Sequence, residues 1–405
     1  MTMRRRSIIF AFFAVFAPQL SLAAMNHGVL ILAPVITFSA GLPPEAVGII
    51  GGLIGLGAVW CFAANSKILP CLGPMRALVF GCLLASAALL SFALDFGWFG
   101  FLAALLVGFG YAVSAPAGSM ILAANTPEKL WGTLFSLRMA GVPAGGAFAG
   151  IIAASVLGHH DWRLSLLILI IPSLFSLVFL KFAKNNIQSP ATLGCFSPLS
   201  ILNPKLFLTP FLVLARVRRL IIITFVSIGF AAVQGSLFTF FTAYLTDALG
   251  FSLSVAGMLY ATLQFSSFAG RIVMGLVSDL IGSPRILITL LGFCSPAGIL
   301  ILLSLEANSP QWLLVLKCVG VGSMIASWNG LFLAEVTRVS ASSDVGECTA
   351  ASTFFTFISF MLAPPIFGML SYNFGYQSAF ILMGGFAVVS ALVMLGSIIK
   401  KPIRT

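Results

Sequence analysis

Long apolar runs recur along the whole chain, and short segments that carry most of the charged residues separate them. Each run is close to the ~20 apolar residues that an α-helix needs to cross the hydrocarbon core of a bilayer. The pattern predicts twelve membrane spans, at residues 7–36, 45–64, 75–94, 97–123, 131–157, 163–182, 219–246, 253–277, 285–304, 311–335, 348–371 and 377–399. The expected fold class is therefore an all-α membrane protein.

The composition supports this expectation. Of the 405 residues, 60% are hydrophobic and 8% are charged. A soluble domain needs about 25% charged residues to cover its surface, so lipid must be the main solvent of this chain. The formal charge of +11 would suit nucleic acid, but its distribution excludes that partner. When the spans alternate sides, one side collects nearly all Lys and Arg and the other keeps only Arg163, which is a topology signal.

The charge asymmetry predicts that both termini are cytoplasmic, and the short loops suggest a bacterial inner membrane. The N-terminus also resembles a secretory signal peptide, with Arg4–Arg6 before an apolar run and Ser21–Ala24 after it. The apolar run continues to Ile36, too far for the core of a signal peptide. An uncleaved first helix is therefore the preferred interpretation.

The two halves of the chain echo each other. A shift of 209 residues places Gly41 on Gly250 and Gly73 on Gly282. A shift of 214 places Gly132 on Gly346, and intermediate glycines match at intermediate shifts. The expected organisation is a six-helix bundle at 1–182, a cytoplasmic linker at 183–218 and a second six-helix bundle at 219–405. Two such halves around a midplane site are a recurring transporter architecture.

A polar loop signature follows the eighth span. Its defining positions are Gly275, Asp279, Gly282 and Arg285, in the spacing GxxxDxxGxxR. This pattern resembles the loop signature of the major facilitator superfamily. Glycines allow helices to approach closely, and Asp279 can accept hydrogen bonds from a helix N-terminus or pair with a cation.

The resemblance implies a transporter that works by alternating access. It also implies a gating network that latches the cytoplasmic side in the outward-open state. The full expected set is Arg271, Gly275, Asp279, Gly282, Arg285, Glu335 and Arg338. The alternative is that these charges only mark topology or reach for the interface. In the first-half copy, Ser66 and Pro70 replace the glycine and the aspartate, so the second-half latch is expected to dominate.

Polar residues inside the spans are the candidate substrate contacts, because ionisable groups in lipid are costly and usually functional. The expected set is Asn26, His27, Arg138, Gln234, Gln264, Lys317, Trp328 and Asn329. Arg138 and Lys317 either face a cavity or extend to an interface. His27 either contacts substrate or a coupling proton, or bonds a neighbouring helix.

The deep charges are cationic, and no Asp or Glu lies deep in a span. A cationic cavity favours a carboxylate or phosphate, so the expected substrate is a small organic anion. The alternatives are a drug or metabolite efflux antiporter, suggested by the Gly/Pro-rich segment 141–146, and a non-transporting membrane sensor or scaffold. An enzyme is not expected, because no catalytic or metal-binding cluster is present. We expect no cofactor, no metal, and a monomer embedded in the lipid bilayer.

Overall fold

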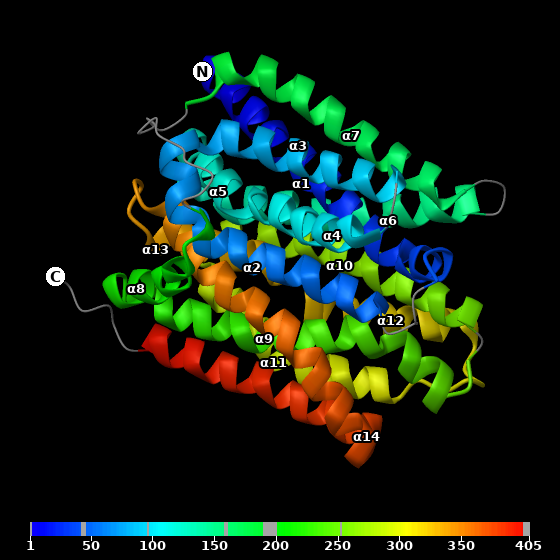
Figure 1. Ribbon diagram of the computed structural model, residues 1–405. Helices are drawn as coiled ribbons and strands as arrows, with labels where there is room; N and C mark the ends of the chain where they lie inside the picture. Colours follow the sequence, from blue (N-terminus) through cyan, green and yellow to red (C-terminus); the bar gives the residue numbers. More distant parts are fainter. Residues whose placement is uncertain are drawn as a thin grey trace. The chain divides into compact units, whose positions relative to one another are not determined.

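The computed structural model describes residues 2–41, 46–94, 97–157, 161–188, 201–251 and 253–399. Its longer helices are α1 (Thr2–Ser39), α2 (Ala46–Leu72), α3 (Pro74–Leu94), α4 (Gly97–Ala112), α5 (Ser114–Asn125), α6 (Trp131–Leu157), α7 (Trp162–Ala183), α8 (Thr209–Arg216), α9 (Arg219–Ala243), α10 (Leu253–Ile281), α11 (Pro284–Leu303), α12 (Gln311–Ala326), α13 (Asn329–Val339) and α14 (Val345–Ile399) (Figure 1). Short helical turns are η1 (Glu128–Leu130), η2 (Lys184–Asn186), η4 (Pro204–Leu208) and η5 (Tyr244–Ala248). No strand occurs among these residues.

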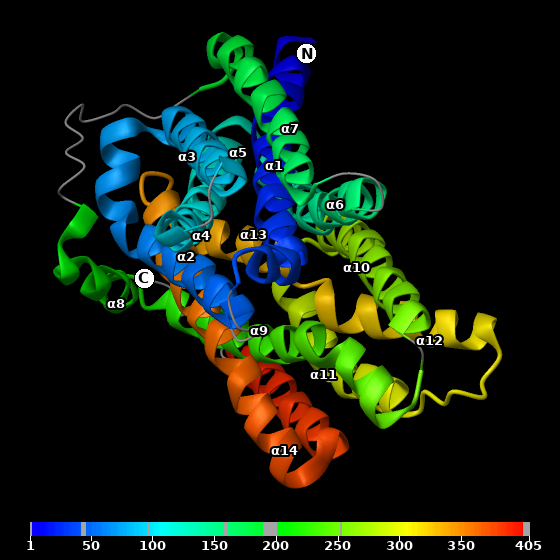
Figure 2. The ribbon, with the colours of Figure 1, turned by 45° about the vertical axis from the view of Figure 1, so that its right-hand side comes forward.

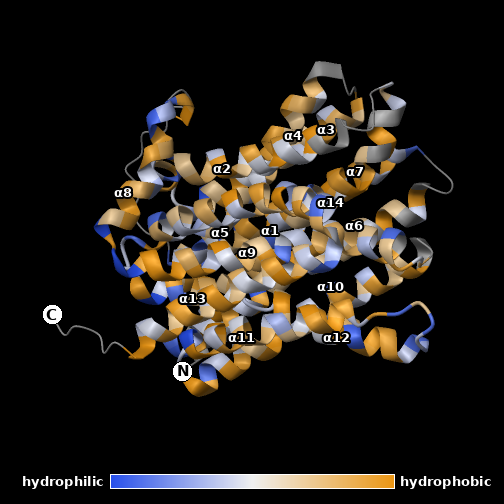
Figure 3. Ribbon diagram, turned by 90° about the horizontal axis from the view of Figure 1, so that it is seen from below, coloured by the Kyte–Doolittle hydropathy of each residue, from blue (hydrophilic) through white to orange (hydrophobic). Residues whose placement is uncertain are grey.

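The helices account for all twelve predicted spans. Within the described ranges, ten helical segments are long and apolar enough to cross a membrane. One of them, α14, holds the last two predicted spans, separated at Gly375 by a non-helical φ of 80°. The remaining span is α10, with 29 residues. Hydrophobic residues cover most of the helices, and hydrophilic residues gather at helix ends and turns (Figure 3).

Two spans are each built from two helices. The fourth predicted span contains α4 and α5, and the tenth contains α12 and α13. The second span is longer than predicted, because α2 continues past residue 64 to Leu72 with Pro70 inside it. The polar residues Asn65, Ser66 and Lys67 suggested a loop, but at a membrane interface polar side chains are compatible with a continuing helix.

The chain forms two compact units. Unit 1 comprises Met1–Glu128, Gly141–Arg216 and Ser340–Phe354. Within it α1 packs along α7, and α2 and α3 pack against α4; Figures 1 and 2 show α1 and α7 side by side. Its buried core includes Leu22, Met25, Phe92 and Leu166.

Unit 2 comprises Lys129–Ala140, Val217–Val339 and Phe355–Thr405. Within it α12 packs against α10 and α11. Its core includes a cluster of aromatic rings, where Phe367 lies 4.7 Å, between ring centroids, from both Phe240 and Phe380. The pairing of α10 with α12 repeats that of α2 with α4, as duplication of a half predicts.

Two helices change unit along their length. The first ten residues of α6, Trp131–Ala140, group with unit 2, and the rest of α6 belongs to unit 1. Conversely, α14 begins in unit 1 and continues in unit 2 from Phe355. Most of the predicted linker, up to Arg216, groups with unit 1, and the division into two six-helix bundles and a linker stays a prediction. Residues 189–200 of the predicted linker and residues 400–405 lie outside the described residues.

The loop glycines support the internal repeat. Gly41 and its predicted counterpart Gly250 have φ values of 66° and 71°. Gly73 and its counterpart Gly282 have φ values of 71° and 76°. Positive φ is readily available only to glycine, so each pair ends its helix with the same turn.

Candidate functional site

The break in the tenth span is the centre of the polar cluster in unit 2. Helix α12 ends at Ala326 and α13 begins at Asn329, so the two residues between them leave the helical hydrogen-bond pattern. Trp328 is 1% exposed, and its indole Nε1 donates to Gln234 Oε1 on α9 at 2.8 Å. Its ring lies 5.4 Å from that of Phe230. Two of the predicted substrate contacts, Gln234 and Trp328, are thus brought together.

Uncharged polar atoms with unused hydrogen-bonding capacity lie around this break. Ser327 Oγ, Asn329 Oδ1 and Ser136 Oγ are buried and have no hydrogen-bond partner among the described residues. A buried polar atom without a partner costs about 1–3 kcal/mol. Such atoms are rare in native structures and call for a specific explanation, such as water, an ion or a functional role.

Arg271 stabilises the broken end of α12. Its Nε donates to the carbonyl of Ala326 at 3.0 Å, and Ser267 Oγ donates to the same carbonyl at 3.2 Å. A cation at a helix C-terminus also offsets the negative end of the helix dipole. Arg271 Nη1 donates at 2.6 Å to the carbonyl of Met139 on α6. One guanidinium therefore joins α10, α12 and the first part of α6.

Arg138 lies in the same region. Its side chain is 0% exposed, and the next residue, Met139, is the one that Arg271 bonds. Two residues before Arg138 on α6, Ser136 lies directly against Gly330, because an added Cβ on Gly330 would be 2.2 Å from Ser136 Cα. These contacts place the Arg138 turn of α6 beside the break in span ten. A buried cation is costly unless an anion or hydrogen-bond acceptors compensate it.

Gln264 has a local partner. Its Nε2 donates to Tyr260 Oη at 3.2 Å, one turn earlier on α10. The Tyr260 ring packs on Phe238 and Phe241 of α9, with centroids 6.2 and 6.1 Å away. Gln264 thus belongs to the contact between α10 and α9, while Trp328 bonds Gln234 on the same helix α9.

Asn26 and His27 belong to unit 1. The His27 imidazole lies against α6, where a Cβ added to Gly146 would be 3.2 Å from His27 Cδ2. Asn26 Oδ1 is buried and has no hydrogen-bond partner among the described residues. Both residues are thus in the packed part of α1, as their place in the sequence predicted.

Lys317 extends toward the end of its span. Its ammonium Nζ donates at 2.6 Å to the carbonyl of Ser304, which is the C-cap of α11. A lysine there offsets the dipole of α11. Of the two predicted alternatives for Lys317, this contact favours the interface over a cavity.

The loop signature holds the start of α6. Asp279 Oδ1 accepts from the backbone N–H of Gly132, and Oδ2 accepts from that of Thr133, each at 2.8 Å. These are among the first N–H groups of α6, which have no partner inside the helix. Of the two predicted roles of Asp279, accepting from a helix N-terminus is the one observed.

Two glycines permit this close approach of α6. A Cβ added to Gly275 would lie 2.7 Å from the carbonyl oxygen of Gly132. A Cβ added to Gly132 would lie 2.5 Å from Asp279 Oδ1. Any larger side chain at either position would therefore displace the carboxylate from the helix end.

The remaining predicted gating residues form an ion-pair network at the same ends of α10, α11 and α13. Arg285 Nε donates to Glu335 Oε1, and Arg338 Nη1 donates to the carbonyl of Gly282 at 2.9 Å. Glu335 is 4% exposed, so burial strengthens its pairing. Six of the seven predicted gating residues thus lie at one end of unit 2, and the seventh, Arg271, lies at the break in span ten.

Sequence reasoning missed the partners of this network. Thr133, Ser136 and Met139 at the start of span five all contact it. The repeat pairing of Gly132 with Gly346 was the available signal. Within the described residues, no group of three or more His, Cys, Asp or Glu side chains is arranged to hold a metal ion.

The chain matches the family model of the Major Facilitator Superfamily over residues 7–343. It is 26% identical to the gentisate transporter of Corynebacterium glutamicum, over 74% of this chain and 66% of that protein. It is 24% identical to the hexuronate transporter of Bacillus subtilis, over 69% of this chain and 68% of that protein. The chain thus spans about two thirds of the length of these relatives.

Solved structures share the fold at low identity. The proton:xylose symporter XylE, bound to 6-bromo-6-deoxy-D-glucose, matches with a TM-score of 0.73 and 13% identity, covering 98% of this chain and 96% of that one. The human organic anion transporter MFSD10 matches with a TM-score of 0.75 and 13% identity, covering 96% and 99%. The transporter FucP, in the outward conformation, matches with a TM-score of 0.73 and 14% identity over the same shares.

The all-helical fold, the family match and the transporter-named relatives define a polytopic membrane protein built for transport rather than for catalysis. The chain belongs to the major facilitator superfamily. The predicted family and fold class are thereby confirmed.

Proposed function

We propose that this protein is a secondary transporter that carries a small organic anion across the cell membrane by alternating access. The observation that carries the proposal is Arg138, a cation 0% exposed inside a span, on the turn of α6 that packs beside the polar break at Ser327–Asn329. A guanidinium in a low-dielectric site recognises a carboxylate by two parallel hydrogen bonds. The two curated relatives are named for gentisate and hexuronate, and both of those compounds are carboxylates at neutral pH.

We assign the polar residues near the break distinct roles in binding. Arg138 would pair with the carboxylate, and the amide of Asn329 and the hydroxyl of Ser327 would bond its other polar groups. The indole of Trp328, fixed by its bond to Gln234, would offer an apolar face to the substrate. His27, on α1, would carry the coupling proton, because histidine is the side chain whose charge changes most readily at physiological pH.

Alternating access requires a latch that can release. Asp279 would hold the start of α6 in one state of the cycle and let go of it in the other, together with the Arg285–Glu335 pair. We place both termini in the cytoplasm and treat the transporter as a monomer. The latch and the binding site are then linked, because Asp279 bonds the start of α6 and Arg138 lies on the same helix.

The efflux antiporter stays the alternative of the same superfamily. A carrier of lipophilic cations normally uses a buried carboxylate. Among the described residues, Glu335 is the carboxylate that lies within a span and is buried, and it pairs with Arg285. The anion carrier is therefore the better match.

A thermal-shift screen of the purified protein tests the proposal. A ligand at a hundredfold excess over its Kd stabilises the folded state by about 2.7 kcal/mol. We expect gentisate or glucuronate to raise Tm, with sugars, amino acids and lipophilic cations inactive. Stabilisation by lipophilic cations alone would reject the anion carrier in favour of efflux.

Lys317→Ala is expected to leave transport nearly unchanged. Because Lys317 bonds the end of α11, its removal costs about 0.3–1 kcal/mol of helix stability and no substrate contact. Uptake by proteoliposomes should keep its half-saturation concentration within about twofold. A large rise in that concentration would place Lys317 in the substrate path instead.

Trp328→Phe is expected to lower Tm while the protein stays folded. The phenyl ring keeps the packing on Phe230 but cannot donate to Gln234, so a buried acceptor loses its partner at a cost of about 1–3 kcal/mol. Adding Gln234→Leu, which removes that acceptor, should recover part of the lost Tm. Equal melting temperatures for all three proteins would show that this bond does not stabilise the break.

A further inference from the structure

The linker between the two halves is docked onto unit 1 at both of its described ends. Asn125, the last residue of α5, donates from Nδ2 to the carbonyl of Gln188 at 2.9 Å and accepts from the N–H of Gln188 at 2.8 Å. Trp60 Nε1 on α2 donates to the carbonyl of Ile201 at 2.7 Å. The segment that leads into η4 and α8 is therefore anchored before those helices begin.

Helix α8 packs one face onto the ends of α2 and α14. Its Pro210 and Val213 line a small pocket together with residues of α2 and of the first turns of α14. The ring of Phe211 lies 6.4 Å, between centroids, from that of Phe354 on α14. On the opposite face, Leu212 is 68% exposed, as expected for a helix lying along a membrane interface.

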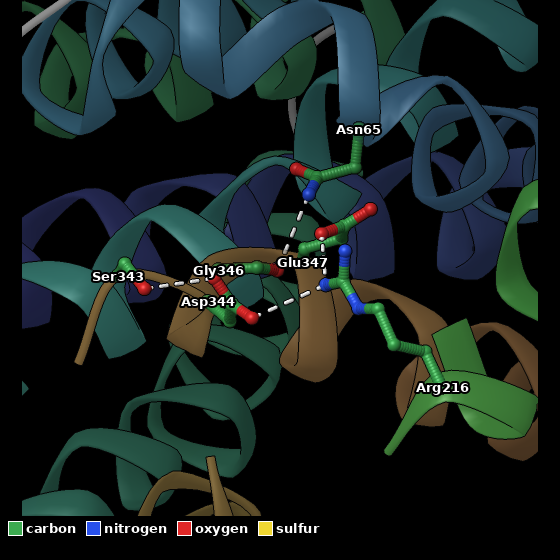
Figure 4. A network of polar contacts seen from close by, with 6 residues as sticks. All are labelled: Asn65, Arg216, Ser343, Asp344, Gly346 and Glu347. Atoms are coloured by element: carbon green, nitrogen blue, oxygen red, sulfur yellow. Dashed lines mark hydrogen bonds and ion pairs between the residues drawn. The ribbon is translucent and has the colours of Figure 1, made fainter. Parts of the chain in front are cut away.

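The last residue of α8, Arg216, forms ion pairs with Asp344 and Glu347 at the start of α14. We call these two ion pairs the clasp. Arg216 Nη2 lies 2.7 Å from Glu347 Oε2 and 3.2 Å from Asp344 Oδ2. Beside this pair, Asn65 Nδ2 of α2 donates to the carbonyl of Gly346 at 3.2 Å (Figure 4). The hydrogen bond and charge of Glu347 raise the pKa of Arg216 further above its ordinary value. Arg216, Asn65 and α14 thus form one connected network.

The starts of α6 and α14 are each held by a charged side chain from another helix, but the sign of that charge differs. The first turn of α6 contains no acidic residue, and Asp279 supplies the carboxylate from α10. In unit 1 the position equivalent to Asp279 is Pro70, which cannot supply one. The start of α14 carries its own acids, Asp344 and Glu347, and receives a cation from α8 instead.

We propose that α8 is the latch of unit 1, with Arg216 as its positioning residue. The clasp holds the start of α14 against α2 in one state of the cycle and opens in another, so the linker is a gating element rather than a passive connection. The cycle itself rests on the proposed function, but the clasp does not. By pairing with Asp344 and Glu347, Arg216 holds the start of α14. The loop after α2 cannot do this, because Pro70 stands where the carboxylate would be.

The reactivity of a cysteine placed in the pocket that α8 covers reports whether the ion pairs of Arg216 are formed. Ala350 is 2% exposed and lines the pocket beneath Val213, so Ala350→Cys in a background without the native cysteines should react slowly with a membrane-impermeant maleimide. We expect Arg216→Glu to speed labelling at least about threefold, because a repulsion replaces two ion pairs. Arg216→Lys should label like the parent, and Arg216→Glu with Glu347→Arg should return toward it.

The matched control is Arg218→Glu, which makes the same charge change two residues beyond the clasp. Equal labelling of Arg216→Glu and the parent, or equal acceleration by Arg218→Glu, would overturn the clasp. Gentisate uptake then shows whether the clasp is a moving latch or a fixed structural contact. Breaking a latch should change the maximal rate of uptake and leave the half-saturation concentration unchanged. An unchanged maximal rate would overturn the gating role. Absence of uptake by the wild type would count against the anion proposal, while labelling still decides the clasp.

Discussion

Arg138→Gln should abolish the stabilisation of this protein by organic anions without unfolding it. Truncating one partner of a buried charge pair costs about 2–5 kcal/mol of binding free energy, which lowers the affinity at least about thirtyfold. Gln keeps a polar side chain at this position, so the empty variant should still fold, and its own Tm without ligand is the reference for each ligand. Gentisate should not raise the Tm of this variant.

Two controls define this result. Arg138→Lys keeps the charge but loses the two-pronged hydrogen bonding, so it should bind with intermediate affinity. Lys317→Ala removes a cation elsewhere in a span and should bind like the wild type. If Arg138→Gln kept the full gentisate-induced rise in Tm, the anion site would have to lie elsewhere.

Asp279→Asn should impair the transport cycle more than it impairs binding. The carboxylate accepts from two N–H groups with two oxygens, and an amide offers one oxygen and no charge. Losing a cap costs about 0.5–2 kcal/mol, which shifts an equilibrium between two conformations by about two- to thirtyfold. We expect a severalfold lower maximal rate of uptake and an unchanged Kd for the substrate.

Asp161 provides the matched control for this prediction. It caps the start of its own helix α7 by accepting from the N–H of Arg163 at 3.1 Å, and it takes no part in the gating network. Asp161→Asn makes the same charge change at the start of another helix but should leave the maximal rate intact. A similar fall in rate for both variants would reduce Asp279 to a structural cap.

The sequence predicted the helices and the chemistry of the loop but not its partners. The lengths of the apolar runs were enough to predict twelve spans. The loop glycines were enough to predict the turns at Gly73 and Gly282. The role of Asp279 stayed divided between two alternatives, because its partner Gly132 lies 147 residues away along the chain. Only the packing of α10 on the start of α6 selects between them.

Long side chains were the least predictable part of the site. Lys317 and Arg138 occupy similar depths in their spans, yet the ammonium of Lys317 reaches Ser304 while Arg138 is 0% exposed. Flexible stems allow such side chains to end several ångströms from their Cα atoms. Their destination depends on neighbouring helices, which the local sequence does not specify. Arg216 illustrates the same limit, since its acidic partners lie more than a hundred residues later.

If a substrate carboxylate pairs with Arg138, the protein must distinguish an acid from its ester. Gentisate and glucuronate are compared with their methyl esters, which keep the ring and the hydroxyl groups but lose the charge. We expect at least one acid to raise the wild-type Tm, its ester to leave it unchanged, and Arg138→Gln to respond to neither. Equal stabilisation by acid and ester, or an undiminished response of Arg138→Gln to the acid, would contradict this pairing.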